Sequence, residues 1–281
     1  MSKKLIVIGA NAAGLSAASA AKRAARDLEV EVFEAGRYVS FANCGMPYFI
    51  GGVVPRVEDL TAASLDELVN KRGLKVHTRH RAEKVDTKSK VVQVRDLDAD
   101  RVFEAKYDDL VISTGAVPVL QAGLDFSLPG VFTLRGLQEA IRIRDFIDQR
   151  SPQRAVVVGA GFIGLEMAES FAARGLEVTL ISRHDRVIPM MEEEVSAAIE
   201  AELKAQGVVI VSGQTVSAVQ AGPDGGLRVR LSGGEALEAD LALFGLGVAP
   251  DNRWLEGTGI ELGIRGAIKV DRKQRTTAPG V

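Results

Sequence analysis

The chain has 281 residues, of which 46% are hydrophobic and 26% are charged. This composition excludes a disordered chain, and the length suffices for two domains of about 150 residues each. Lys and Arg total 35 against 37 for Asp and Glu, so the net charge of -2 gives no electrostatic basis for a nucleic-acid partner or a membrane surface. One cysteine excludes an intramolecular disulfide framework and a multi-cysteine zinc site, and we predict no metal. No apolar run reaches the roughly 18 residues of a membrane-spanning helix.

The N-terminal segment predicts a βαβ unit. Residues 5–8 form a short apolar run typical of a buried strand, residues 15–26 form an Ala-rich helical stretch, and residues 30–33 form a second strand. Between the first strand and the helix lies the turn Gly-Ala-Asn-Ala-Ala-Gly at 9–14. Glu34 ends the second strand, 20 positions after the last glycine of that turn. Lysines before the first strand and small residues after it would also fit a signal peptide, but the βαβ unit explains the same residues better.

The same order recurs about 150 residues later, which makes an internal repeat. A strand at 155–158 leads into Gly-Ala-Gly-Phe-Ile-Gly at 159–164, and a helix at 165–174 and a strand at 177–181 follow. Glycines at this spacing allow the tight turn, the close approach of a pyrophosphate and close helix packing. The second turn matches the full pattern, whereas Asn11 replaces the middle glycine of the first. Two glycine turns with no ligand are the alternative interpretation.

The residues that end the second strand of each repeat differ in charge. Glu34 can accept hydrogen bonds from both ribose hydroxyls of an adenosine, as in FAD or NAD. The equivalent position is Ser182, followed by Arg183 and His184, and this run would attract a 2′-phosphate that a carboxylate repels. We therefore predict FAD in the first unit and NADPH in the second, with NADH possible. The alternative is that Arg183 and His184 are a solvated surface pair.

The segments around these repeats complete the predicted domains. Further elements are expected as short antiparallel strands at 76–103, a strand at 110–112 before a small-residue turn, a helix at 137–147 and a strand at 242–244. The fold class is α/β, with two Rossmann-like three-layer domains, the second inserted in the first. Residues 1–116 and 246–281 are predicted to form the FAD-binding domain, and residues 117–245 the NAD(P)-binding domain.

The lone cysteine lies in an unusual segment, residues 40–52, where aromatic residues, proline and glycines surround one thiol. A lone cysteine is most often a small buried hydrophobic residue. Its place shortly after an FAD-type unit favours a redox role for Cys44. A thiolate there would attack a disulfide or a peroxide, and a flavin would return electrons from a nicotinamide.

Several motifs occur together in the order expected of one family. The motif segments are 7–14, 40–48, 113–116, 158–166 and 245–251. On these residues the chain resembles the flavoprotein disulfide reductases with two dinucleotide-binding folds. Within them it resembles the single-cysteine branch, which holds coenzyme A-disulfide reductases, NADH oxidases, NADH peroxidases and NAD(P)H-dependent persulfide reductases. The resemblance covers essentially the whole chain.

The resemblance implies roles for individual residues. Cys44 would be the redox centre, and Phe49 stands where dithiol relatives carry a second cysteine. The oxidised thiol would then be a sulfenic acid, a persulfide or a mixed disulfide. Phe162 would stand over the flavin, with Glu166 near it. The residues predicted to bind the cofactors are Gly9, Asn11, Ala12, Ala13, Gly14, Glu34, Ala35, Thr114, Gly115, Ala116, Gly159, Gly161, Phe162, Ile163, Gly164, Glu166, Ser182, Arg183, His184 and Gly247.

The branches of the family differ at positions that this chain contains. Peroxidases and water-forming oxidases carry a histidine where Ala12 stands, which counts against peroxide and oxygen chemistry. The run before the cysteine is the one that coenzyme A-disulfide reductases prefer. Their coenzyme A contacts correspond to Ser16, Arg23, Ser40 and Asn43. Arg23, with Lys22 and Arg26, would suit coenzyme A phosphates, or these charges form an ordinary solvent-exposed helix face.

The resemblance also concerns the end of the chain. In the family, the run at 276–281 leads into a further strand, a flavin-contacting aspartate and a dimerisation domain. We therefore expect a fragment or truncated form of a longer protein. The resemblance implies that this longer protein forms a homodimer. A cytoplasmic location is predicted from the free thiol and the lack of a targeting signal.

The predicted function is an FAD-dependent NAD(P)H oxidoreductase that reduces coenzyme A disulfide or a related disulfide or persulfide. The alternatives are an NAD(P)H oxidase and an inactive flavin- or nucleotide-binding fragment.

Overall fold

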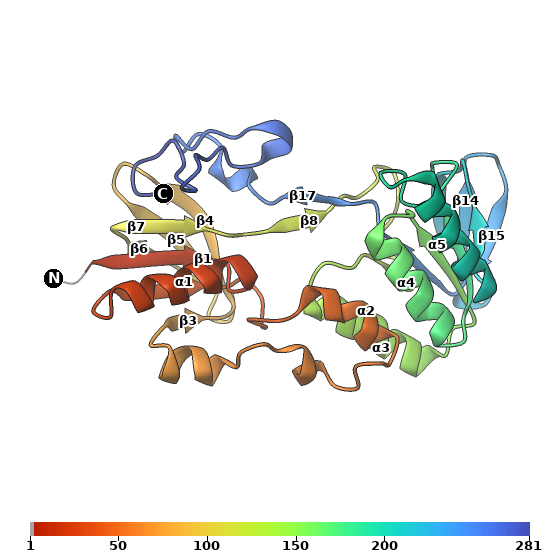
Figure 1. Cartoon of the computed structure of the whole chain (residues 1–281), viewed down its shortest axis with the longest axis horizontal. Helices are drawn as coiled ribbons and strands as arrows, with labels where there is room; N and C mark the ends of the chain where they lie inside the picture. The colour runs from red at the N-terminus through yellow and green to blue at the C-terminus, as the bar shows by residue number, and fades with distance from the viewer. Residues whose placement is uncertain (1–2) are drawn as a thin grey trace. The chain divides into compact units, whose positions relative to one another are not determined.

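The computed structural model describes residues 3–281 and combines parallel sheets, antiparallel sheets and helices (Figure 1). The chain divides into two compact units. Unit 1 holds the residues up to Ala42, then Thr61–Val117 and Ala249–Val281, and unit 2 holds Asn43–Leu60 and Pro118–Val248. Strands β8 (Ala116–Pro118) and β17 (Val248–Pro250) pair where the chain passes between the units.

The unit boundaries differ from the predicted domains mainly at residues 43–60. The prediction placed this segment in the first domain, but it belongs to unit 2. Met46, Phe49 and Ile50 are buried there, on a short helix that packs against two helices of unit 2. Burial of these apolar side chains, which sequence order does not reveal, decides where the segment lies. Which cofactor each unit holds stays a prediction.

Unit 1 is built on a four-stranded parallel sheet in the order β3-β2-β1-β7. Its strands are β1 (Lys4–Ile8), β2 (Glu29–Phe33), β3 (Lys75–His77) and β7 (Asp109–Ile112). Val7 and Val32 are fully buried, as expected for strands that are covered on both faces. The helix α1 (Ala12–Ala24) covers one face, where Leu15 and Ala18 pack against the strand residues.

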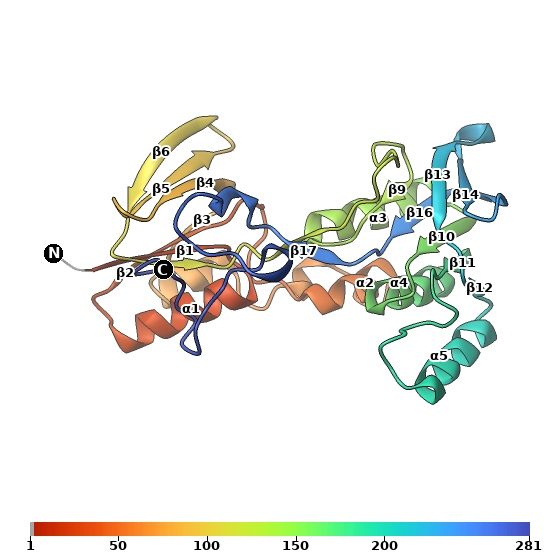
Figure 2. The same ribbon diagram turned by 90° about the horizontal axis from the view of Figure 1, so that it is seen from above.

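An antiparallel sheet covers the opposite face of this parallel sheet (Figure 2). It consists of β4 (His80–Asp86), β5 (Val91–Asp96) and β6 (Arg101–Lys106). Val85, Val92 and Ala105 share a buried cluster with Ile6 and Phe33 of the parallel sheet. Unit 1 is therefore a three-layer α/β unit, as predicted. One detail of the prediction is wrong, because Val76 belongs to β3 and pairs parallel with Val32 rather than joining the antiparallel strands.

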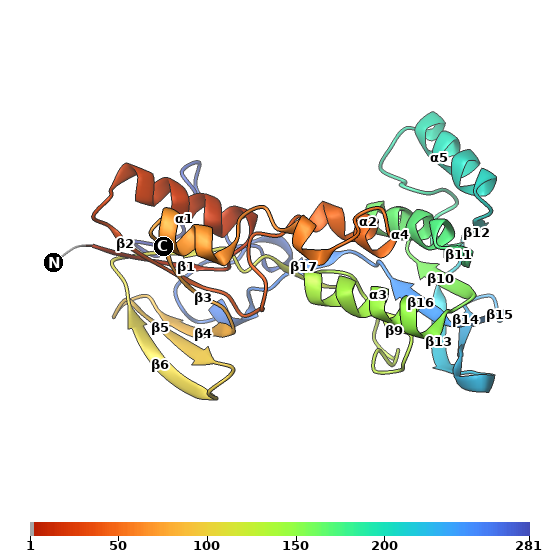
Figure 3. The ribbon, with the colours of Figure 1, turned by 90° about the horizontal axis from the view of Figure 1, so that it is seen from below.

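Unit 2 repeats this arrangement around a five-stranded parallel sheet in the order β12-β11-β10-β16-β9 (Figure 3). Helices α4 and α5 lie on one side of it, and antiparallel strands cover the other side. The elements are α2 (Met46–Ile50), β9 (Val131–Phe132), α3 (Leu137–Arg150), β10 (Arg154–Val158), α4 (Phe162–Ala173), β11 (Glu177–Ile181), α5 (Glu193–Ala205), β12 (Val209–Val211), β13 (Val216–Ala221), β14 (Leu227–Leu231), β15 (Ala236–Ala239) and β16 (Leu241–Phe244).

The helix starts differ from the sequence prediction in a systematic way. Both α1 and α4 begin three residues earlier than predicted, at Ala12 and Phe162. The last glycine of each turn lies inside the helix, because glycine there permits close packing on the preceding strand. The helix α5 and strands β12 to β15 were not predicted. Short helices of about one turn lie at Asn43–Gly45, Val57–Leu60, Glu67–Lys71, Pro223–Gly225, Arg253–Leu255 and Ile264–Gly266.

A charged network at the start of the unit 1 sheet predicts a pH-dependent stability. Glu31 accepts a hydrogen bond from His77 Nε2 at 2.8 Å and pairs with Lys4. The hydrogen bond from His77 is the main cause that lowers the pKa of Glu31 from 4.5 to about 2. Its stabilising effect is therefore complete above the unfolded pKa and is lost as the pH falls toward 2. We expect Glu31→Gln to lower the free energy of unfolding by about 2 kcal/mol at pH 7 and by less than about 1 kcal/mol at pH 3.

Urea unfolding followed by circular dichroism at both pH values measures this difference. The exposed Glu104 on β6, changed to glutamine, is the matched control and should have little effect at either pH. An equal loss at pH 7 and pH 3 for Glu31→Gln would show that packing, and not the carboxylate charge, stabilises this corner.

Candidate functional site

The first glycine turn places the N-terminus of α1 at the carboxyl end of β1. Gly9 has φ +102°, and a Cβ there would lie 2.3 Å from the carbonyl oxygen of Ser113. A Cβ at Gly14 would lie 1.9 Å from the carbonyl oxygen of Gly9, so helix and turn are in direct backbone contact. Asn11 is the N-cap residue of α1 and has extended backbone angles. The turn therefore offers a helix N-terminus and a closely packed backbone to an anionic group.

Glu34 lies beside this turn, where the sequence placed it. Its Oε2 accepts a hydrogen bond from the Ala10 amide at 2.8 Å, and its Oε1 accepts one from the Gly36 amide at 2.7 Å. Glu34 and Ala35 are half-buried. The carboxylate is thus held at the end of β2, next to the turn, by backbone donors. A ribose bound at the turn would meet an acceptor already in position.

The second glycine turn has the same geometry, with one instructive difference between its glycines. Gly159 has φ +107°, and a Cβ there would lie 2.4 Å from the carbonyl oxygen of Gly245. A Cβ at Gly164 would lie 1.8 Å from the carbonyl oxygen of Gly159. Gly161, the N-cap of α4, has φ -89° and no atom within 4 Å of an added Cβ. Gly159 and Gly164 are thus required by the fold, whereas the fold of the protein itself does not require Gly161.

This difference yields a prediction with two matched variants. We expect Gly161→Ala to keep the thermal midpoint of the protein, while its methyl group fills the space that a nucleotide pyrophosphate approaches. The affinity for NADPH should then fall at least about tenfold. Gly159→Ala should instead destabilise the fold, because it forces a left-handed backbone and a backbone clash. Thermal unfolding and nucleotide titration measure both, and unchanged NADPH affinity in Gly161→Ala would contradict a nucleotide at this turn.

The start of α4 carries the side chains that the resemblance links to the flavin and nicotinamide. Phe162 is 55% exposed, and Ile163 is half-buried beside it. Glu166 follows one turn later, and burial, with a smaller contribution from the charge of Glu169, raises the pKa of Glu166. The Phe162 ring is therefore accessible at the helix start, where the resemblance implies that it stands over the flavin. The roles of these residues stay predictions.

The run after β11 is divided between the interior and the surface. Ser182 is buried, and its Oγ lies 2.9 Å from the His184 carbonyl oxygen and 3.2 Å from the His184 amide. Its hydroxyl therefore organises the loop. Arg183 and His184 are exposed and adjacent, with Arg183 Nε donating to His184 Nε2 at 3.1 Å. The loop returns to the glycine turn, where the Ile188 amide donates to the Ala160 carbonyl at 2.9 Å. Two basic side chains thus project from a loop that is bound to the turn.

The small-residue turn after β7 and its counterpart after β16 lie in different units. Thr114 Oγ1 lies 3.3 Å from the Asp251 carbonyl oxygen, and Gly115 has φ +74°. Ala116 begins β8. Gly247, in unit 2, is exposed with φ +97°. Each of these glycines therefore adopts a backbone conformation that other residues rarely reach, which explains the glycine at both strand-to-turn motifs.

Cys44 is exposed and lies in the single helical turn Asn43–Gly45, directly before α2. The general expectation that a lone cysteine is a buried hydrophobic residue is therefore wrong here. Phe49 is 6% exposed, so the position of a second cysteine in dithiol relatives is occupied by a core phenylalanine. The thiol is accessible to a substrate and has no internal disulfide partner, since the chain has one cysteine.

The residues predicted for coenzyme A fall in both units. Ser16 and Arg23 are exposed on α1, and the Ser40 amide donates to the Ala10 carbonyl at 2.9 Å, next to the first glycine turn. Asn43 is exposed in unit 2. Lys22 is bound elsewhere, since its Nζ donates to the Leu28 carbonyl at 2.7 Å. Arg23 therefore has more freedom than Lys22 to meet a phosphate.

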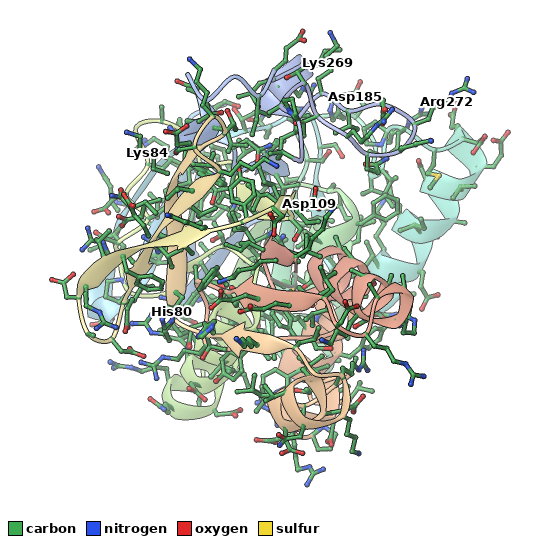
Figure 4. All side chains as sticks on the ribbon, turned by 90° about the vertical axis from the view of Figure 1, so that its left-hand side faces the viewer. His80, Lys84, Asp109, Asp185, Lys269 and Arg272 are labelled. Atoms are coloured by element: carbon green, nitrogen blue, oxygen red, sulfur yellow. The ribbon has the colours of Figure 1, made fainter. Side chains whose placement is uncertain are left out.

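Unit 1 also contains a cleft of about 1140 Å³ that sequence reasoning did not identify. Ala13 and Ala17 of α1, residues of β7 and the chain from Ile268 to Val281 line it. The Leu110 amide of β7 donates to the Gly280 carbonyl at 2.8 Å, so the C-terminal residues run beside this strand. Figure 4 shows Asp109 at β7 and Lys269 and Arg272 on the C-terminal segment. Ala13 of the glycine turn thus borders an open space of ligand size.

Sequence reasoning missed the residues that hold the Cys44 segment in place. Arg144 on α3 and Arg174 after α4 donate to carbonyl groups of that segment. Local sequence carries no signal for these contacts, because the partners are about 90 or more residues apart. Among residues 3–281, no group of His, Cys, Asp and Glu side chains could hold a metal ion, and no helix is both long and apolar enough to cross a membrane.

The two units define the class of protein. Each places a glycine-rich turn at a helix N-terminus between parallel strands, and these are the features of a dinucleotide-binding Rossmann-like unit. The family model for pyridine nucleotide-disulphide oxidoreductases matches residues 3–281, and the chain belongs to this family. The family uses FAD together with a nicotinamide nucleotide.

Curated relatives and solved structures match almost the whole chain. A coenzyme A disulfide reductase of Staphylococcus haemolyticus is 34% identical over 279 residues, which are 99% of this chain and 62% of the relative. An NAD(P)H sulfur oxidoreductase (CoA-dependent) of Pyrococcus abyssi is 36% identical over 280 residues, 99% of this chain and 61% of the relative. The reduced CoADR-RHD structure of Bacillus anthracis has a TM-score of 0.95 and 32% identity, covering 100% of this chain and 50% of that one. The chain thus spans 61–62% of the length of these two curated relatives.

Proposed function

We propose that the longer protein to which this chain corresponds reduces coenzyme A disulfide, or a related small disulfide or persulfide, with electrons from NAD(P)H. The single observation that carries the proposal is an exposed, solitary thiol, Cys44, with a buried phenylalanine at position 49. Such a thiol can form a disulfide only with a substrate or another molecule. Relatives named as coenzyme A disulfide reductase and as NAD(P)H coenzyme A polysulfide/persulfide reductase support this substrate class.

The residues present fit the cofactors that the proposal needs. The Gly9–Gly14 turn and the carboxylate of Glu34 suit the pyrophosphate and ribose of FAD, and the Gly159–Gly164 turn suits a nicotinamide nucleotide. FAD, when bound, supplies a two-electron relay between the nicotinamide and the thiol.

The chemistry that the chain itself contributes centres on Cys44. Its thiolate forms a bond to one sulfur of the substrate disulfide, the disulfide S–S bond breaks, and the other sulfur leaves as a thiolate. Two electrons that originate from NAD(P)H then reduce the mixed disulfide on Cys44, which releases the second thiolate and restores the cysteine thiolate. The two departing thiolates take up protons from water according to the pH.

The nicotinamide nucleotide is proposed to be NADPH, with NADH as a weaker substrate. Arg183 and His184 project from the loop beside the second glycine turn, where a 2′-phosphate would need positive charge. A solved structure titled an engineered water-forming NADPH oxidase bound to NADPH has an aspartate replaced by alanine and two arginines introduced. It is 29% identical with a TM-score of 0.92 and covers 99% of this chain and 61% of that one. Those substitutions remove a carboxylate and add positive charge. The loop of this chain likewise has Ser182 at the end of the strand and the basic Arg183 after it.

A second candidate function is an NAD(P)H oxidase. The water-forming NADH oxidase of Lactobacillus brevis has a TM-score of 0.93 and 30% identity and covers 99% of this chain and 61% of that one. Ala12, in place of the histidine of oxidases and peroxidases, argues against it. Oxygen consumption without added disulfide would favour the oxidase. A homodimer of the longer protein and a cytoplasmic location stay predictions.

The experiment that tests the proposal is an absorbance spectrum of the purified protein with FAD, followed by anaerobic titration with NADPH and then NADH. A flavin spectrum that bleaches with NADPH, and a long-wavelength band between thiolate and flavin, are the expected results. A protein that binds no FAD would contradict flavin chemistry by this chain alone. A flavin that NADPH reduces, but whose electrons pass to oxygen and not to coenzyme A disulfide, would favour the second candidate.

A further inference from the structure

The segment that carries Cys44 is held on unit 2 through its backbone carbonyl groups. Arg144, on α3, donates from Nη1 to the carbonyl oxygens of Phe49 and Val54, at 3.0 Å each. These carbonyls belong to the end of α2 and to the chain just beyond it. A helix end leaves its last carbonyl groups without partners inside the helix, so side-chain donors stabilise it there. One guanidinium thus ties together the two sides of this turn.

Two further residues hold the same segment from α4 and its C-terminal end. Ser170 Oγ lies 2.9 Å from the Pro47 carbonyl oxygen, and Arg174 Nη1 lies 3.4 Å from the Ile50 carbonyl oxygen. An added Cβ at Gly51 would come within 3.3 Å of Ser170 Cβ, so a glycine allows the two segments to approach closely. The Ser170 hydroxyl also lies 2.7 Å from the Glu166 carbonyl oxygen of its own helix, so it shares its proton between α4 and the segment. The segment is therefore held from α3 by Arg144 and from α4 and its C-terminal end by Ser170 and Arg174.

Asp148 joins the two arginines. Its carboxylate accepts a hydrogen bond from Arg174 Nη2 and lies 3.7 Å from Arg144 Nε. The Arg144 guanidinium also lies over the ring of Phe49, 4.4 Å from its centroid. The arginine side chains are only 21% and 23% exposed, so these interactions are partly shielded from solvent. We call Arg144, Asp148, Ser170 and Arg174 the carbonyl clamp.

We propose that the carbonyl clamp positions the Cys44 thiol, with Arg144 as its main positioning residue, and this inference rests on the proposed function. Cys44 lies in the single helical turn Asn43–Gly45, which runs directly into α2. The clamp holds α2, and through α2 it holds the turn that carries the thiol. The helix α4 carries the glycine turn at its start and Ser170 near its end. The thiol is therefore fixed in the same frame as the proposed nucleotide site.

The clamp matters because attack on a disulfide needs the thiolate sulfur aligned with the S–S bond that breaks. A displacement of about 1 Å by a change remote from the reacting atoms can slow a reaction by about 10². A change that only alters the exposure of a thiol would affect every thiol reagent alike. A change in position should instead affect a large, oriented substrate more than a small alkylating agent.

The experiment compares Arg144→Met, Arg144→Lys and the control Arg142→Met. Arg142 lies on the same helix, is 61% exposed and pairs with Glu139. The first readout is the release of coenzyme A when the reduced chain meets coenzyme A disulfide in a single turnover. We expect roughly a tenfold slower release for Arg144→Met, part of the rate regained with Arg144→Lys, and no change for Arg142→Met. Alkylation of Cys44 by iodoacetamide should keep its rate in all of them.

A second readout does not depend on the proposed substrate. The single cysteine allows a trifluoroethylthio label at Cys44, whose ¹⁹F spectrum reports the environment of that site. We expect one sharp line for the wild type and Arg142→Met, and broadened or additional lines for Arg144→Met. If Arg144→Met fails to fold, Ser170→Ala, which removes one hydroxyl, replaces it in both readouts.

A wild-type ¹⁹F line and a wild-type rate of coenzyme A release in Arg144→Met would overturn the clamp. Faster alkylation together with a lowered melting temperature would also overturn it, because that result would show that the substitution destabilises the whole fold and does not specifically displace the thiol. If the wild type itself releases no coenzyme A while the ¹⁹F lines change as expected, the clamp stands and the proposed substrate is wrong.

Discussion

Replacing Cys44 by serine is expected to abolish disulfide reduction. The reduced wild-type chain should release one coenzyme A per molecule from coenzyme A disulfide, and Cys44→Ser should release none, because the hydroxyl cannot form a disulfide bond. In the FAD-loaded longer protein, steady-state turnover with coenzyme A disulfide should fall by roughly 10³ or more. Thiol release is followed with a chromogenic disulfide in a coupled assay, or by mass spectrometry of the mixed disulfide.

The control for this experiment is reduction of the flavin by NADPH, which should keep its wild-type rate in Cys44→Ser. Cys44 is exposed, so the substitution removes no buried packing and should leave the melting temperature unchanged. Turnover retained in Cys44→Ser would sink the assignment of the thiol as the redox centre. Loss of flavin reduction together with turnover would instead point to damage at the nucleotide site.

The second large effect is expected at the nicotinamide nucleotide. Arg183→Ala removes the guanidinium beside the second glycine turn, and a hydrogen bond to a charged group contributes about 1.5–3 kcal/mol. We therefore expect the dissociation constant for NADPH to rise by about 10- to 100-fold, with little change for NADH. Tryptophan or nicotinamide fluorescence titration measures both constants on the same preparation.

Arg228→Ala is the matched control, because Arg228 is an exposed arginine on β14 that pairs with Glu238 and lies away from the glycine turn in sequence. It should change neither constant. Raising the salt concentration should weaken NADPH binding to the wild type more than NADH binding, since Arg183, the predicted partner of the 2′-phosphate, is exposed. Equal weakening of NADPH and NADH by Arg183→Ala would contradict recognition of the 2′-phosphate.

Much of the fold was predictable from the sequence because its signals are local. The two βαβ units are confirmed, since apolar runs of strand length and glycine turns mark the places where strands give way to helices. The early starts of α1 and α4 escaped prediction because the last glycine of each turn lies inside the helix. The helix α5 and the antiparallel strands β13 to β15 were missed, although alternate residues of Leu227–Leu231 are buried, as a strand of period two requires.

The candidate site was predictable only as a set of residue types. The structure requires glycine at positions 159 and 164, because an added Cβ at either would clash with the backbone. An added Cβ at Gly161 would meet no protein atom, so the space beside it is open. Ser182 was predicted, with Arg183 and His184, to attract a 2′-phosphate, and this stays a prediction; its hydroxyl contacts the His184 backbone within its own loop. Side-chain direction depends on the backbone of the whole loop, and a sequence pattern does not contain it.

The sequence alone determined the family, the two glycine turns at helix starts and the single thiol, because glycine spacing, strand patterns and the count of cysteines are properties of short segments. Only the tertiary structure decided that residues 43–60 join unit 2, that Cys44 is exposed beside a buried Phe49, and that Arg144 and Arg174 hold that segment by its carbonyls. These outcomes depend on contacts between residues about 90 or more positions apart, where burial and hydrogen bonding select one partner among many.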